Sequence, residues 1–194
     1  MLSEGHHDVP TGHVAAVVTH LEMHARPPRR DVPEAHGVTV EEWHPSLKAY
    51  RDLFRAVGGP WLWASRLFLD DETLGGINGD ALYETRVMRR GGTAIGILDL
   101  DFRSGGACEL AYFGLVPGAV GAGLGRRLME TALDRAFRDG PLRFHVHTCT
   151  LDGPAALDFY RRSGFVPVRR QVEIMRDPRG DLLPEDAAPQ VPRL

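Results

Sequence analysis

Residues 113–128 read Phe-Gly-Leu-Val-Pro-Gly-Ala-Val-Gly-Ala-Gly-Leu-Gly-Arg-Arg-Leu, and this stretch decides the fold. The apolar run that ends at Pro117 predicts a strand, and the alternate glycines Gly121, Gly123 and Gly125 predict a tight turn. The residues that follow predict a helix, because apolar side chains fall on one stripe and charged side chains fall opposite it. The stripe consists of Leu124, Leu128, Met129, Ala132, Leu133, Ala136 and Phe137, and the opposite face of Arg126, Arg127, Glu130, Asp134, Arg135 and Arg138.

A glycine turn that opens a helix favours an anion. The first amides of a helix have no partner within it, and the helix dipole is positive at that end, so a phosphate is the expected guest. Two well-known phosphate-binding motifs do not match this stretch. A Walker loop ends in Gly-Lys-Ser/Thr, whereas Gly125 is followed by Arg126 and Arg127. The dinucleotide fingerprint needs G-x-G-x-x-G, whereas the spacing here is G-x-G-x-G.

Composition indicates one soluble globular domain. The chain has 194 residues, of which 43% are hydrophobic and 25% charged, and no apolar run approaches the roughly 20 residues of a membrane span. The formal net charge of −3 argues against a nucleic-acid partner. Two cysteines predict no disulfide framework, and the N-terminus lacks the pattern of an export signal, so we expect a cytoplasmic protein.

The remaining elements follow from periodicity and turn signals. We expect residues 1–12 to be flexible, a single domain over 13–176, and a mobile tail over 177–194. Residues 25–37 are expected to form a surface linker, and Trp61-Leu62-Trp63 an extended step with both indoles on one side. The predicted strands are 14–23, 82–89, 93–102, 108–116, 142–150 and 165–175, with a turn at Gly91-Gly92, and the predicted helices are 46–57, 70–79, the helix from 124, and 153–163. Ser46 and Asp152 are the expected N-caps of the first and last helices, and three acids at 70–72 indicate the start of the second.

Two segments of the chain resemble the GNAT superfamily of N-acetyltransferases. In the family's signature, a strand that ends near Val-x-Pro leads into Gln/Arg-x-x-Gly-x-Gly/Ala. Gly123 and Gly125 match the two glycines, and Pro117 matches the proline. Val120 stands where the signature has Gln or Arg. The run from Asp152 to Phe165 resembles the family's Asn-x-x-Ala-x-x-Leu/Phe-Tyr-x-x-x-Gly-Phe, although Gly153 replaces the asparagine. Its matching residues are Ala156, Phe159, Tyr160, Gly164 and Phe165.

The resemblance implies an α/β (α+β) GNAT fold: a mixed, mostly antiparallel sheet of six to seven strands flanked by about four helices. It implies that the glycine loop holds the pyrophosphate of acetyl-coenzyme A, and that an N–H near Leu115 or Val116 bonds the acetyl oxygen. The activity implied is transfer of the acetyl group to a primary amine by direct attack. The coenzyme contacts implied are Leu115, Val116, Val120, Gly121, Ala122, Gly123, Leu124, Gly125, Arg126 and Tyr160.

The resemblance also suggests catalytic roles. Tyr160 occupies the position of the tyrosine that faces the coenzyme sulfur in similar enzymes, which makes it the candidate acid. Glu109 stands eleven residues before Val120, where the histone acetyltransferase branch keeps its glutamate, so it is the candidate base; a water chain is the alternative. His145, His147 and Cys149 alternate on one strand, but no further ligand pattern accompanies them, and we expect no metal.

The acceptor is expected to be a small-molecule amine. Trp61 and Trp63 lie where similar proteins build the acceptor pocket, although both indoles are also compatible with an ordinary core. Alternative readings are a noncatalytic module that binds acyl-coenzyme A and an acetyltransferase for proteins or peptides. We expect no membrane partner, and either a monomer or a homodimer.

Overall fold

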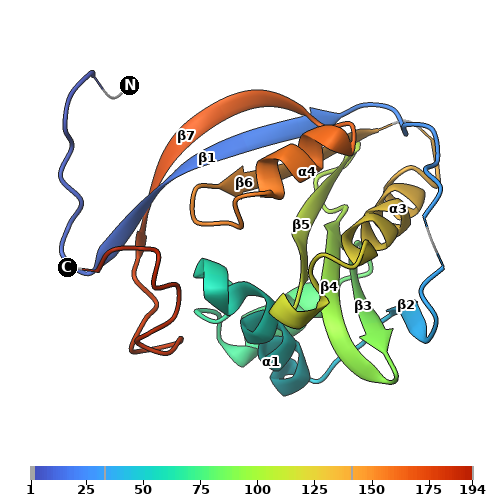
Figure 1. Cartoon of the computed structure of the whole chain (residues 1–194), viewed down its shortest axis with the longest axis horizontal. Coiled ribbons are helices and arrows are strands. Elements are labelled where there is room, and N and C mark those ends of the chain that lie inside the picture. The colour runs from blue at the N-terminus through green and yellow to red at the C-terminus, as the bar shows by residue number, and fades with distance from the viewer. Residues whose placement is uncertain (1–2, 33, 141, 194) are drawn as a thin grey trace.

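The computed structural model describes residues 3–32, 34–140 and 142–193 of the chain. Figure 1 shows a twisted sheet with helices on both faces. The strands are β1 (His13–Met23), β2 (Val38–Glu42), β3 (Tyr83–Arg90), β4 (Thr93–Asp101), β5 (Ala107–Leu115), β6 (Arg143–Cys149) and β7 (Val166–Arg176). The helices are α1 (Leu47–Gly58), α2 (Asp71–Asn78), α3 (Leu124–Ala136) and α4 (Ala156–Arg162), with 3₁₀ turns at Gly59–Trp61 (η1) and Pro117–Ala119 (η2).

The seven strands form one sheet in the order β2-β3-β4-β5-β6-β1-β7. Every neighbouring pair is antiparallel except β5 and β6, which confirms the predicted mixed, mostly antiparallel sheet. The expected order of elements omitted β2, a five-residue edge strand with little buried surface, whose pattern is too short to indicate a strand. The first strand, β1, lies between β6 and β7. Together β1 and β7 form a long arching ribbon (Figure 1).

Local signals for the helices and turns are confirmed in three places. The Ser46 hydroxyl accepts from the Ala49 amide at the start of α1, and Asp70 accepts from Thr73 at the start of α2. Gly91 and Gly92 both have positive φ between β3 and β4, as a two-residue hairpin turn requires.

The prediction of an extended Trp61-Leu62-Trp63 step is wrong. Residues 59–61 form a 3₁₀ turn, and Leu62 has a φ of 58°. Because the backbone turns here, the indoles of Trp61 and Trp63 contact different residues, whereas an extended segment would have placed both on one side.

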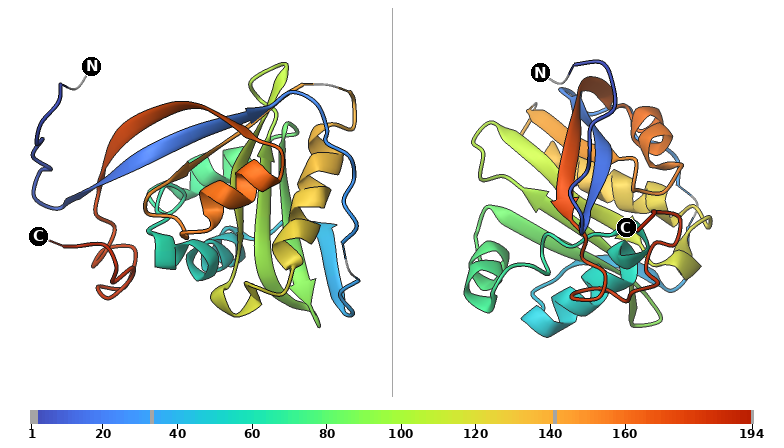
Figure 2. Two further views of the ribbon diagram at one scale, coloured as in Figure 1. Left: turned by 45° about the horizontal axis from the view of Figure 1, so that its top comes forward. Right: turned by 90° about the vertical axis from the view of Figure 1, so that its left-hand side faces the viewer.

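Two apolar cores hold the sheet, one on each face. Helices α3 and α4 lie on one face, and α1 and α2 lie on the other (Figures 1 and 2). Their apolar side chains pack into the core on the face that each pair covers. The first core includes Leu98, Leu110, Leu128, Phe144 and Tyr160; the second includes Tyr50, Phe54, Leu74, Val87 and Ile97. Each helix is therefore fixed by its apolar stripe.

Glu130 departs from the predicted charged face of α3, because it is buried. Arg26, in the segment after β1, donates to Glu130 at 2.9 Å and to Asp134 at 2.6 Å. Buried carboxylates are retained when a cation pairs with them, so this contact ties the segment after β1 to α3.

The residues after β7 fold back toward α1. Leu183 and Ala188 are buried in the core that α1 builds, and the Gln190 side-chain amide donates to the Pro60 carbonyl at 2.9 Å. Arg179 is buried and pairs with Asp177. The tail that the sequence predicts to be mobile thus supplies apolar side chains to the second core. Within the described residues, no helix has the length and apolarity to cross a membrane.

A buried carboxylate lies beneath α1. Asp99 on β4 is fully buried, and its Oδ2 accepts from the Tyr50 hydroxyl at 2.6 Å and from the Tyr83 hydroxyl at 2.9 Å. Burial raises the pKa of Asp99 to about 6, against the opposing effect of these two hydroxyls and of Arg66. The ionised form of Asp99 therefore depends on its two tyrosine donors.

Replacing Tyr50 by phenylalanine should destabilise the fold by about 1.5–3 kcal/mol at pH 8, because an ionised carboxylate loses a donor. The raised pKa of Asp99 means that its contribution to stability is greatest in acid and is lost as the pH rises through about 6. Tyr50→Phe raises that pKa further, so the loss should be smaller at pH 5. Urea unfolding at both pH values measures this, with Tyr112→Phe as the control. An equal loss of unfolding free energy at pH 5 and pH 8 would contradict the stabilisation of ionised Asp99 by the Tyr50 hydroxyl.

Candidate functional site

The site is built around a divergence in the sheet. Strands β5 and β6 pair in parallel over only three residue pairs, Ala107–Glu109 with Arg143–His145. Beyond these pairs β5 runs on along β4, whereas β6 runs on along β1 (Figure 1). The sheet therefore opens between the two strands, and backbone groups on the facing edges are available to a bound molecule.

The glycine loop lies at the open end of β5 and leads into α3. Gly121 and Gly123 have φ of 90° and 75°, and Gly123 occupies the N-cap of α3 without a capping side chain. In the described part of the chain, the amides of residues 121–125 donate to no protein group, while the Arg126 amide donates to the Gly123 carbonyl. An anion suits such a helix start, where unpartnered amides and the positive dipole end coincide.

The backbone geometry distinguishes between Leu115 and Val116. The Val116 amide donates to the Ile95 carbonyl of β4 at 2.9 Å, so it is already engaged. Because successive amides of a strand point to opposite sides, the Leu115 amide points away from β4 and toward the gap. Of the two predicted donors, Leu115 has the available amide.

Tyr160 lies on α4 within an aromatic cluster. Its ring is buried and lies 6.2 Å from that of Phe113, 5.8 Å from Phe159 and 5.9 Å from Phe165 between centroids. Burial raises the pKa of its hydroxyl, which keeps the proton in place at neutral pH. No group among the described residues hydrogen-bonds this hydroxyl.

Glu109 lies on β5 at the last pair before the strands diverge. Its Oε1 is 3.5 Å from Nδ1 of His147 on β6. This contact lowers the pKa of Glu109 against the effect of burial, and it raises the pKa of His147. His145, opposite Glu109, has its pKa lowered mainly by burial. The sequence predicts Glu109 and His147 on two separate strands, and the structure brings their side chains together.

Glu109 and Tyr160 lie on opposite faces of the sheet. A register shift between Asp99 and Leu100 places one extra residue in β5. As a result Glu109 and Tyr112 share the α1 side, whereas Phe113, which packs on Tyr160, faces the α3 side. The gap between β5 and β6 connects the two faces, so a molecule lying in it has access to both candidate groups.

The two tryptophans border the loop after β6. Trp63 Nε1 donates to Asp152 Oδ1 at 3.2 Å, and a Cβ on Gly114 of β5 would lie 3.3 Å from the Trp63 ring. A Cβ on Gly153 would lie 3.4 Å from the Trp61 ring. Trp63 thus spans the diverging ends of β5 and β6.

Asp152 does not cap α4, contrary to the sequence expectation. The N-cap of α4 is Ala155, which makes no side-chain cap bond. The Asp152 carboxylate instead accepts from the Thr148 hydroxyl at 2.7 Å and from the Cys149 amide at 2.9 Å, as well as from Trp63. Asp152 therefore fixes the loop beside the gap.

Sequence reasoning missed Tyr112 and its neighbours. The Tyr112 hydroxyl bonds Ser65, its ring lies 5.4 Å from that of Trp63, and the Arg66 guanidinium lies 5.1 Å from the centroid of the Tyr112 ring. Strict alternation would place Tyr112 on the face opposite Glu109, and only the register shift brings it to the same side.

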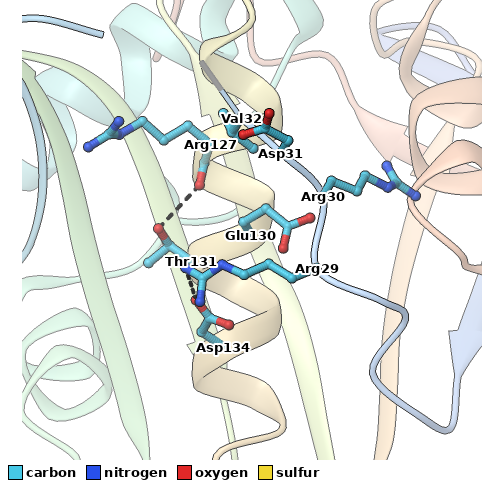
Figure 3. Close-up of a pocket in the computed structure, with 8 residues that line it drawn as sticks. All are labelled: Arg29, Arg30, Asp31, Val32, Arg127, Glu130, Thr131 and Asp134. Carbon is cyan, nitrogen blue, oxygen red and sulfur yellow. Dashed lines mark hydrogen bonds and ion pairs between the residues drawn. The ribbon is translucent and has the colours of Figure 1, made fainter. Parts of the chain in front are cut away.

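A separate polar cleft of about 530 Å³ lies between residues 29–32 and α3 (Figure 3). Two of the acids that line it are paired, since Arg29 lies 3.1 Å from Asp134 and Arg26 bonds Glu130. Over the ranges that the structure describes, no cluster of three or more His, Cys, Asp or Glu side chains suits a metal ion. The gap and the glycine loop are therefore the candidate site, because their unpartnered backbone donors lie close to Glu109 and Tyr160.

The chain matches the model of the acetyltransferase (GNAT) family over residues 33–165. A comparison with curated proteins gives no match. The matched range excludes β1.

Solved structures share the fold at low sequence identity. A GCN5-related N-acetyltransferase from Sphaerobacter thermophilus has a TM-score of 0.64 and 14% identity, over 84% of this chain and 53% of that one. One from Kribbella flavida has a TM-score of 0.55 and 22% identity, over 88% and 62%. An aminoglycoside acetyltransferase from an uncultured soil metagenomic sample, in complex with trehalose, has a TM-score of 0.54 and 17% identity, over 66% and 88%. The chain thus spans less than two thirds of the length of the first two structures.

Replacing His147 by glutamine tests the pairing with Glu109. Because folding lowers the pKa of Glu109, ionised Glu109 stabilises the folded chain at pH values above its ordinary pKa of 4.5. This stabilisation is lost as the pH falls through the lowered pKa. Because folding raises the pKa of His147, protonated His147 stabilises the folded chain at pH values below its ordinary pKa of 6.5. This stabilisation is lost as the pH rises through the raised pKa. The stability difference between wild type and His147→Gln should therefore be largest between these two pH values.

Urea unfolding at pH 5.5 and pH 8.5 measures this difference. His36→Gln, which removes an exposed histidine, is the control for general effects of losing the side chain. A difference for His147→Gln that is as large at pH 8.5 as at pH 5.5 would rule out the ion pair.

Proposed function

The chain belongs to the acetyltransferase (GNAT) family, and from this premise we propose that it transfers an acetyl group from acetyl-coenzyme A to a primary amine of a small molecule. The observation that carries the proposal is the run of unpartnered amides at residues 121–125, at the end of the gap between β5 and β6. This arrangement supplies donors for a pyrophosphate and an open strand edge for the amide-bearing arm of the coenzyme.

The coenzyme is proposed to enter from the loop side. Amides of the glycine loop bind the pyrophosphate, and Arg126, exposed in the first turn of α3, adds positive charge. Val120, which replaces the usual Gln/Arg, is 67% exposed, so its side chain does not obstruct the loop. The Leu115 amide is proposed to donate to the acetyl oxygen, where it would stabilise negative charge as the carbonyl is attacked.

The reaction needs a base for the amine and a proton for the departing thiolate. We assign the base to Glu109, directly or through water, because its low pKa keeps it ionised and His147 lies beside it. A carboxylate at this place also opposes the positive charge that the attacking amine develops. Tyr160 is assigned as the acid, since its raised pKa holds the proton until the thiolate forms.

The acceptor is proposed to bind on the α1 side, next to Glu109. Trp61 and Trp63 border this region, and an indole face suits an apolar or cationic ligand. The aminoglycoside acetyltransferase among the structural neighbours makes amine-bearing sugars a reasonable first set of acceptors. A panel of small amines and peptides, assayed by thiol release, tests the class; peptides that outperform every small amine would contradict it.

A second candidate function is a noncatalytic module that binds acyl-coenzyme A. The replacement of the signature residues by Val120 and Gly153 favours it. The same thiol-release assay separates the two functions, because such a module would bind the coenzyme without releasing thiol.

Acetyl-coenzyme A at 100 times its dissociation constant should stabilise the fold by about 2.7 kcal/mol. Gly123→Asp should abolish this stabilisation, because a carboxylate in the loop repels the phosphates and the residue must keep a positive φ. Gly105→Asp, which adds the same charge in a hairpin turn with open space around it, is the matched control. Thermal melts with and without coenzyme measure both, and a wild-type melt that does not move would contradict coenzyme binding.

Tyr160→Phe should lower kcat by about 10²- to 10⁴-fold with little change in coenzyme affinity, because it removes a proton donor and keeps the ring.

Glu109→Gln should lower the rate most near neutral pH and recover part of it at high pH, where the amine loses its proton unaided. Steady-state rates across pH measure both variants, with Glu41→Gln on β2 as the control. Wild-type turnover and pH profile in both variants would overturn the assigned roles.

A further inference from the structure

The outer face of the β1–β7 ribbon is apolar and open. Strand β7 is the last strand of the sheet, and nearly all of its residues are exposed. Among them are four large aliphatic side chains. Val172 and Ile174 share a face with Val17 of β1, which lies opposite Val172, whereas Val166 lies beyond the register shift and on the other face, opposite Glu22. The exposed fractions are 62% for Val166, 55% for Val168, 52% for Val172, 49% for Ile174 and 42% for Val17. A long apolar edge strand is a template for pairing with another chain.

The open edge presents a defined set of backbone groups. Asp177 donates its amide to the Gly12 carbonyl, so the odd-numbered residues of β7 bond to β1 where the register is regular. The even-numbered residues Arg170, Val172 and Ile174 therefore direct their N–H and C=O groups away from the sheet. These groups meet no protein partner among the described residues.

From this edge we propose that a second copy of the chain pairs with β7 in antiparallel register, with the two-fold axis at Gln171. Residues whose numbers sum to 342 then lie opposite each other. Arg170 and Val172 exchange backbone hydrogen bonds with Val172 and Arg170 of the second copy, which the free even-numbered groups allow. Gln171 is held in place within each copy, since its Oε1 lies 2.7 Å from His20 Nε2.

Charge complementarity selects this register. It places Arg169 opposite Glu173 of the second copy, and symmetry repeats the pair. Neither side chain has an ion-pair partner within the described part of its own chain. An axis at Arg170 or at Glu173 places that residue opposite its own copy and sets like charges face to face. An axis at Val172 places Arg169 opposite Met175 and Glu173 opposite Gln171, so it forms no ion pair.

The apolar side chains fit the same register. Val168 lies opposite Ile174 of the second copy, so the exposed aliphatic rows of the two copies continue each other. The ladder ends near Pro167, which has no N–H, at the register shift between His20 and Leu21. The free edge of β7 can therefore pair with a short strand of complementary sequence, and β7 of a second copy is such a strand.

Sedimentation velocity on the full chain tests the proposal. Wild type should be dimeric at tens of micromolar, and Val172→Lys should be monomeric while it keeps the wild-type circular dichroism spectrum and coenzyme-independent melting temperature. Arg169→Glu and Glu173→Arg alone should each weaken the dimer by about tenfold, because two pairs change from attraction to repulsion. The double variant Arg169→Glu/Glu173→Arg should restore the wild-type dissociation constant.

Three results would overturn the proposal. A wild-type chain that stays monomeric shows that the edge has no second copy as its occupant. A dimer that Val172→Lys leaves intact uses another surface. A double variant that is no tighter than either single variant shows that Arg169 and Glu173 are not opposite each other. Each of these readouts is independent of catalysis.

Discussion

The divergence of β5 and β6 after three residue pairs is the constraint on which the rest of the site depends. A sheet that stayed paired would satisfy every backbone group along β5 and leave no donor for a ligand. Here β1 takes the far side of β6 and draws it away from β5, while Trp63 and Asp152 span the separated ends. The Leu115 amide and the glycine loop become available because of this geometry, and both faces of the sheet meet at the opening.

Charge is distributed around the opening in a way that suits the proposed chemistry. Glu109 and His147 form a coupled pair on the α1 side, where each holds the other in its charged form over mildly acidic pH. Tyr160 lies on the α3 side in an apolar setting that keeps its proton. Asp99 lies deeper, under Tyr50 and Tyr83, and serves the fold rather than the opening. The acid and base roles that we propose for Tyr160 and Glu109 thus rest on different surroundings, as in sites where two groups need separated pKa values.

The strongest sequence signals predicted the scaffold correctly. The stripe of α3, the hairpin glycines and the caps at Ser46 and Asp70 are local features, and local features survive folding. What the sequence did not predict depends on contacts between distant segments. Neither the place of β1 beside β6 nor the bonds that Asp152 makes can be read from spacing, and the register shift that aligns Tyr112 with Glu109 leaves no periodic trace. The buried Glu130 was missed for the same reason, because its partner Arg26 lies more than 100 residues away.

We propose that the unpartnered amides at the end of the gap bind the coenzyme, and amide hydrogen exchange measures those amides directly. In the chain alone, the amides of residues 121–125 should exchange fast, because no protein group protects them. Saturating acetyl-coenzyme A should slow the exchange of these amides and of Leu115, and it should leave Val116, already bonded to Ile95, nearly unchanged. Exchange at residues 121–125 that is the same with and without coenzyme would contradict the account.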